Sequence, residues 1–160
     1  MRFTLLHPGT AGRGPLADAA ADYLARLRRN PALEVGEVFV KPVKLRRESD
    51  AEVQQALDTE ASRVLAKLSS SDLVVALDRT GEAWSSAQWA NAIRRWRDDG
   101  RRVVALVLGS PHGLSRQLLK RADKRLSFGP LTLPHELARV VLWEQVYRAH
   151  AIIAGTPYHK

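Results

Sequence analysis

The chain has 160 residues, 45% hydrophobic and 26% charged, and this balance fits one globular domain spanning residues 1–160. It lacks cysteine, which excludes disulfides and thiolate metal sites and suits the cytoplasm, and it has no apolar run long enough for a signal peptide or a membrane span. The net charge of +8 points to an anionic polymer, above all nucleic acid, as the partner.

Strand-like and helix-like hydrophobic periods alternate along the whole chain. In chain order, the predicted elements are a strand at 3–7, a helix over 16–27, a strand at 35–40, a mobile basic loop at 41–49, a helix over 53–68, a strand at 73–77, a helix from 85 or 86 to 99, a strand at 103–108, a helix from 115, a short strand at 125–128 and a last helix. This alternation predicts an α/β fold with a mostly parallel sheet flanked by helices.

Residues that commonly begin or end helices support these boundaries. The predicted starts of the second, third and fourth helices are Ser49 or Asp50, Ser85 or Ser86, and Ser115. Gly100 ends the third helix, and Pro134 is expected in the first turn of the last one.

Three loops follow predicted strands and contain glycine: residues 77–81, 108–113 and 128–135. Ligands of open parallel sheets bind beyond the carboxyl ends of the strands, and glycine lets the backbone approach a ligand closely. No dinucleotide fingerprint, phosphate-binding loop, zinc-protease motif or serine-hydrolase motif is present. Ser110 is therefore a turn residue rather than a nucleophile, and no metal site is predicted.

The last thirty residues combine an amphipathic helix with a chemically rich tail. Leu137, Val140 and Val141 are expected to face the core, and Trp143 an oligomer interface. Glu144 and Arg148 form an i,i+4 pair, which is a surface support in its simplest interpretation. The tail ends in a phenol, an imidazole and an ammonium group at residues 158–160, a set suited to a flat, polar, anionic ligand.

Three segments resemble the ribosomal RNA large subunit methyltransferase H family of the SPOUT class: VVALDRTG (74–81), LVLGSPHGLS (106–115) and LSFGPLTLPHELARVVLWEQVYRAHAIIAGTPYHK (126–160). The resemblance covers essentially the whole chain. It implies a C-terminal trefoil knot, a homodimer, and S-adenosylmethionine bound in the knot loops. It further implies N3-methylation of a pseudouridine in helix 69 of 23S ribosomal RNA in the assembled ribosome, with no membrane or metal involved.

The resemblance also implies which residues bind and react. The cofactor positions carried over from the family are Leu77, Gly109, Phe128, Gly129, Pro130, Leu131, Thr132 and Leu133. For positioning the base or moving its N3 proton, the first candidates are Tyr158 and His159, and the second are Glu144 and Arg148. The identity of the general base stays open.

One loop departs from the family pattern. Where relatives carry two adjacent glycines and commonly an acid, this chain has Gly109-Ser110-Pro111-His112-Gly113. The departure motivates an alternative function, an RNA- or ribosome-binding protein of the same fold with impaired catalysis.

Overall fold

The computed structural model describes residues 1–47 and 49–159, with only the backbone given for His159. Its sheet contains five parallel strands in the order β2-β1-β4-β3-β5. The strands are β1 (Arg2–Pro8), β2 (Glu34–Val40), β3 (Leu73–Ala83), β4 (Val103–Leu108) and β5 (Lys124–Ser127). The predicted α/β class with a parallel sheet is therefore confirmed.

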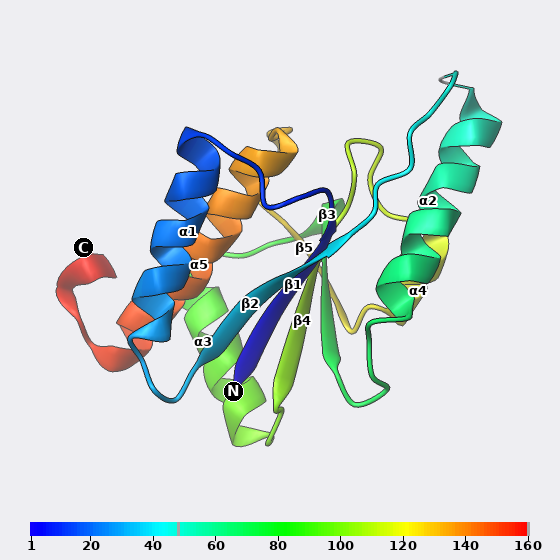
Figure 1. Cartoon of the computed structure of the whole chain (residues 1–160). Coiled ribbons are helices and arrows are strands. Elements are labelled where there is room, and N and C mark those ends of the chain that lie inside the picture. Colours follow the sequence, from blue (N-terminus) through cyan, green and yellow to red (C-terminus); the bar gives the residue numbers. More distant parts are fainter. Residues whose placement is uncertain (48, 160) are drawn as a thin grey trace.

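Helices cover both faces of the sheet (Figure 1). The helices are α1 (Pro15–Arg28), α2 (Asp50–Leu65), α3 (Ser86–Asp98), α4 (Arg116–Arg121) and α5 (His135–Ala154), with a short 3-10 turn η1 (Pro157–His159). One layer consists of α1, α3 and α5 packed side by side, and the other consists of α2 and α4. Among the described residues, no helix combines the length and apolar character that crossing a membrane would require.

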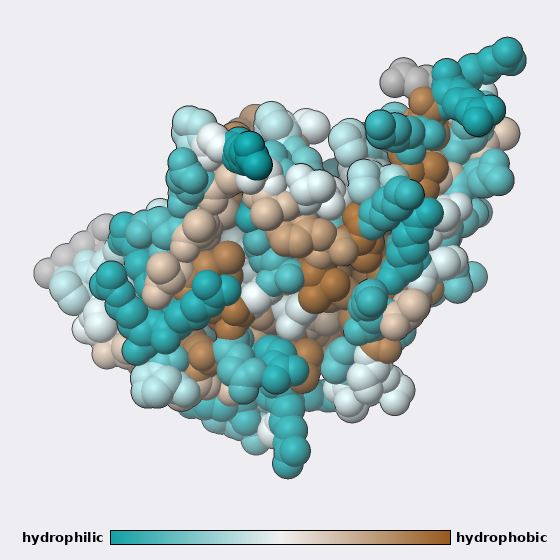
Figure 2. Space-filling model, viewed as in Figure 1, coloured by the Kyte–Doolittle hydropathy of each residue, from teal (hydrophilic) through white to brown (hydrophobic). Residues whose placement is uncertain are grey.

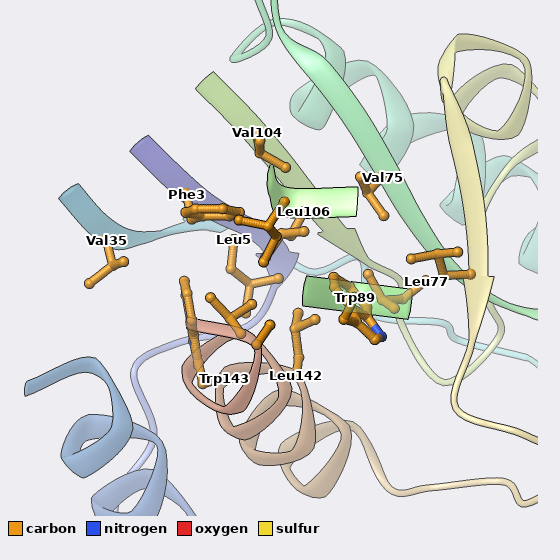
Figure 3. Close-up of a cluster of buried hydrophobic side chains, with 14 of the residues drawn as sticks. Phe3, Leu5, Val35, Val75, Leu77, Trp89, Val104, Leu106, Leu142 and Trp143 are labelled. Atoms are coloured by element: carbon orange, nitrogen blue, oxygen red, sulfur yellow. The ribbon is translucent and has the colours of Figure 1, made fainter. Parts of the chain in front are cut away.

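Alternate residues of each strand enter the two helical layers, because successive side chains in a strand point to opposite faces. On β1, Phe3 and Leu5 belong to the core under α1, α3 and α5, whereas Leu6 belongs to the core under α2 and α4. Figure 3 shows Leu142 and Trp143 of α5 reaching from their helix toward this first core. Both faces of the central strands are therefore apolar, as their unbroken hydrophobic runs predicted.

The predicted helix starts are largely confirmed. The hydroxyls of Ser49, Ser85 and Ser115 accept backbone N–H bonds as N-caps, and Ser85 forms a reciprocal capping box with Gln88. Pro134 is an exception, because it is the N-cap of α5 and so precedes the first turn instead of lying in it.

The predicted core face of α5 was wrong. Trp143 was expected at an oligomer interface, but it is fully buried and its indole N–H donates to Glu37 at 2.8 Å. Leu137, Val140 and Val141 are only partly buried. The buried face instead consists of Ala138, Arg139, Leu142, Trp143, Val146 and Ala149. The helix is apolar on most sides, so its pattern did not show which side faces the sheet.

Candidate active site

The three glycine-containing loops leave three neighbouring strands at one edge of the sheet. Leu77 of β3 is in register with Leu108 of β4 on one side and with Leu126 of β5 on the other. The segments after these positions therefore emerge side by side, where parallel sheets bind their ligands. The structure thus brings together the cofactor positions that the sequence placed in separate loops.

The first loop is a bulge within β3, not the end of the strand as predicted. The strand continues to Ala83, and its register with β5 shifts between Leu77 and Glu82. Gly81 allows this close passage, because a Cβ there would lie 2.6 Å from backbone atoms of Leu126. The Leu77 side chain is 7% exposed, so this residue can offer a ligand little beyond its backbone.

A small ionic cluster stiffens the same bulge. Arg125 donates to the Asp78 carboxylate at 2.9 Å and to Thr80 Oγ1 at 2.7 Å. Burial alone would raise the pKa of Asp78, but hydrogen bonds from Thr80 and Arg125 outweigh it, and the net shift is downward. Asp78 is therefore ionised at neutral pH.

The second loop is a tight turn that accommodates its unusual serine without strain. The Gly113 N–H donates to the Ser110 carbonyl at 2.8 Å, and only Gly113 has a positive φ, +95°. Gly109 passes so close that a Cβ on it would lie 2.3 Å from the Gly113 oxygen. The two glycines are thus required by the turn itself, whereas Ser110 has ordinary backbone angles and His112 is exposed.

The third loop, residues 128–134, joins β5 to α5 and presents an exposed side chain at its centre. The Ser127 hydroxyl both accepts from the Gly129 N–H and donates to the Gly129 carbonyl, each at 3.0 Å. Gly129 has φ +101°, a conformation that L side chains rarely adopt. Leu131 is 75% exposed, while Leu133 packs partly against the core. An exposed leucine between fixed turns is suited to cover a flat, apolar ring.

Two histidines connect the second loop to the start of α5. His135 Nδ1 lies 2.9 Å from the Gly109 carbonyl, and His135 Nε2 lies 2.9 Å from His7 Nδ1. A carbonyl only accepts, so His135 Nδ1 carries a proton; when His135 is neutral, its Nε2 accepts from His7. The resulting chain of donors runs from β1 through α5 to the Gly109 loop.

The histidine chain is held in the neutral form by burial. His7 is fully buried, and its Nε2 has no hydrogen-bond partner. Burial, followed by the positive charge of a protonated His135, lowers the pKa of His7 to about 4. The contact with Gly109 thus uses uncharged imidazoles at neutral pH.

A buried ion pair anchors the same end of α5 to β2. The Arg139 guanidinium donates twice to the Glu37 carboxylate, at 2.7 Å each, and also to Glu136 and to the Ala11 carbonyl. Burial would raise the pKa of Glu37, but bonds from Arg139 and Trp143 lower it overall. The start of α5 is therefore fixed to the sheet and to the loop after β1.

The tail candidates form a second cluster. The Tyr158 hydroxyl donates to Glu144 at 3.2 Å and so accepts from Tyr23 at 3.1 Å. Arg148 donates to Glu144 at 2.8 Å and lies 4.8 Å from the centroid of the Tyr158 ring. Burial and the bonds with Tyr23 and Glu144 raise the pKa of Tyr158, so its hydroxyl stays protonated. The His159 side chain lies outside the described residues.

The two clusters lie at opposite ends of α5. Residues 128–134 lead into its first turn and η1 follows its last, and Figure 1 shows these ends far apart. A helix of 20 residues is about 30 Å long. One chain therefore cannot bring its own tail to its own cofactor loops in this conformation.

Neither His7 nor Glu37 stands out in the sequence. Each is a single polar residue in a strand, and the partners that explain them, His135 and Arg139, lie 128 and 102 residues away. The only signal is a charge or imidazole at a position that strand alternation assigns to the core. In the described part of the chain, no group of three or more His, Asp or Glu side chains could hold a metal ion.

Comparisons with known proteins agree with this architecture. A family model described as a predicted SPOUT methyltransferase matches residues 1–159. A "Ribosomal RNA large subunit methyltransferase H" from Acidiphilium cryptum is 43% identical over 99% of this chain and 94% of the relative. A protein of the same name from Anaeromyxobacter sp. is 43% identical over the full length of both.

Solved structures support the fold. A probable methyltransferase from Bordetella pertussis aligns with a TM-score of 0.55 at 19% identity, covering 92% of this chain and 94% of that one. A probable methylase family protein from Haemophilus influenzae aligns with a TM-score of 0.57 at 13% identity, covering 96% of this chain and 66% of that one.

Proposed function

The chain belongs to the SPOUT methyltransferase family, and from this premise we propose that it is an S-adenosylmethionine-dependent methyltransferase of 23S ribosomal RNA. Its proposed product is N3-methylated pseudouridine in helix 69 of the assembled ribosome. The observation that carries the proposal is the convergence of three loops at Leu77, Leu108 and Leu126, beside one another at the carboxyl edge of the sheet.

The residues present fit the methyl donor. The proposed cofactor-binding residues are Leu77, Gly109, Phe128, Gly129, Pro130, Leu131, Thr132 and Leu133. Leu131 offers an exposed apolar surface for the adenine ring, and the tight turns at Gly109 and Gly129 present backbone groups for hydrogen bonds. When bound, the donor supplies an electrophilic methyl group on its sulfonium.

The tail is proposed to hold the target base. The hydroxyl of Tyr158 is occupied by Tyr23 and Glu144, so Tyr158, Glu144 and Arg148 act as the anchor of the tail. A phenol with a raised pKa is a poor base at neutral pH. His159, the next residue, is therefore the proposed group that contacts the base or its N3 proton.

A homodimer completes this site. Because α5 separates the tail from the cofactor loops, the tail of one chain is proposed to meet the loops of its partner. The partly exposed apolar residues of α5, Leu137 and Val141, offer a surface for such a contact. A trefoil knot made by the loops after β3, β4 and β5, and a cytoplasmic location beside the ribosome, belong to the same proposal.

Two measurements test the proposal. Calorimetry should detect S-adenosylmethionine binding in the sub-millimolar range, and purified ribosomes lacking the modification should gain one methyl group at the target pseudouridine by mass spectrometry. Absence of binding would favour the alternative, a ribosome-binding protein with impaired catalysis. The unstrained backbone at Ser110 argues against that alternative, since the serine leaves the turn intact.

A further inference from the structure

The segment between β2 and α2 carries an unusual density of unpaired positive charge. Residues 41–47, the basic arm, contain four cations and no acid. All four side chains are exposed, and none forms a salt bridge within residues 1–47 and 49–159. The cations are Lys41, Lys44, Arg46 and Arg47.

Although the basic arm contains no helix or strand, its backbone is anchored. The Val43 N–H donates to Glu60 at 2.9 Å, the Arg47 N–H donates to Glu52 at 2.8 Å, and Arg63 donates to the Lys41 carbonyl. The acids near the arm thus accept from its backbone rather than pairing with its cations. A fixed backbone lowers the entropy lost when such side chains bind a partner.

The basic arm stands at the same edge of the sheet as the cofactor loops. It follows Val40, the last residue of β2, which is in register with Pro8. Its anchor Glu60 lines a narrow crevice together with Gly109 and Gly113 of the second loop. In Figure 1 the arm rises at the upper right beyond the carboxyl ends of the strands, and Figure 2 shows hydrophilic side chains at that corner.

We infer that the basic arm binds the phosphate backbone of the RNA substrate next to the target nucleotide. This inference rests on the proposed function, which brings RNA to this edge. Four exposed, unpaired cations on an anchored loop match regularly spaced phosphates, and such contacts add affinity without reading sequence. Each neutralised phosphate adds about 0.7 to 0.9 to the slope of log affinity against log salt concentration, so four contacts contribute about 3.

The test compares two variants of equal charge. Replacing Lys41, Lys44, Arg46 and Arg47 with glutamine lowers the net charge from +8 to +4, and so does replacing Arg95, Arg97, Arg101 and Arg102 at the opposite, amino edge of β4. Affinity for large ribosomal subunits and for protein-free 23S ribosomal RNA is measured between 50 and 200 mM salt, roughly the range over which phosphate contacts dominate.

The arm variant should bind both probes about tenfold or more weakly at low salt, with a slope lower by about 3 per chain. Its KM for ribosomes should rise while kcat and S-adenosylmethionine affinity stay unchanged. The control variant should change the slope much less. Equal effects of the two variants, or an arm variant that loses affinity for subunits but not for free RNA, would overturn the inference; the second result would assign the arm to a ribosomal protein. A wild-type enzyme that transfers no methyl group would refute the proposed function instead, whatever the slopes.

Discussion

The imidazoles of His7 and His135 meet at 2.9 Å although 128 residues separate them, and the second imidazole contacts the Gly109 carbonyl. The first residue of α5 thus sets the orientation of a peptide in the second cofactor loop. The contact is made from the side of the loop that faces the core, which leaves the outer side for a ligand.

Replacing His135 with alanine should weaken S-adenosylmethionine binding about tenfold, since a lost hydrogen bond of about 1 to 1.5 kcal/mol leaves the Gly109 carbonyl unpaired. The His7→Leu variant should have a smaller effect, because the bond from His135 to Gly109 remains. Calorimetry measures both. Unchanged binding in His135→Ala would show that the loop keeps its shape without this contact.

Stability should fall as the pH falls from about 6.5 to 4. Burial, then neighbouring positive charge, lowers the pKa of both His7 and His150 to about 4. The unfolded chain binds these protons near pH 6.5 and the folded chain does not, so protonation favours unfolding. Each histidine contributes up to about 3 kcal/mol to this loss. Urea unfolding at several pH values measures it, and the His150→Phe variant should show a shallower dependence; an identical dependence would contradict the assignment.

The Arg139→Met variant should lose about 3 to 5 kcal/mol of unfolding free energy, because it leaves the Glu37 carboxylate buried without its partner. The double variant Glu37→Met/Arg139→Met should recover most of that loss. Chemical denaturation of the two single variants and the double variant gives the coupling energy. If the double variant is as unstable as the sum of the singles, the pair does not act as a unit.

Removing the Tyr158 hydroxyl tests the anchor of the tail. Tyr158→Phe should lower kcat at least about tenfold while S-adenosylmethionine affinity stays unchanged, since one positioning hydrogen bond is worth about 1 to 1.5 kcal/mol. Tyr23→Phe should have a milder effect, because Tyr158 keeps its bond to Glu144. Deleting residues 158–160 should abolish methylation with cofactor binding intact; full activity of that truncated chain would refute the role of the tail.

Mixing two inactive chains tests the shared site. Gly109→Ala disrupts the second loop, because its Cβ would lie 2.3 Å from the Gly113 oxygen. Combined in equal amounts with the tail-deleted chain after joint refolding, it should restore about a quarter of wild-type activity, since half the dimers are mixed and each has one complete site. No recovery, despite mixed dimers detected by mass spectrometry, would contradict a site built from two chains.

Local features of the sequence predicted local structure well. The serine caps, the end of α3 at Gly100 and the two central strands depend on neighbouring residues, so their patterns were sufficient. The bulge after Leu77 was not predictable, because it arises from pairing with Leu126 and Ser127 much later in the chain. The buried face of α5 was also missed, since a helix that is apolar all round has no period to read.

The candidate site shows the same division. Glycine at three strand ends indicated where a ligand binds, and the strand register confirmed that these ends are neighbours. The tail cluster was predicted as a set of residues, but its separation from the cofactor loops follows from the length of α5 and its packing. The histidine chain depends on a tertiary contact that no local pattern encodes.

The strand order has a consequence for how the chain folds. β4 lies between β1 and β3, so Leu106 is in register with Leu5 on one side and with Val75 on the other. Until residues 103–108 have left the ribosome, β1 and β3 each keep an unpaired edge, and the two parts of the sheet have nothing to join them. A nascent chain that stops short of Val103 should therefore be prone to aggregation, and folding should be completed only late in synthesis.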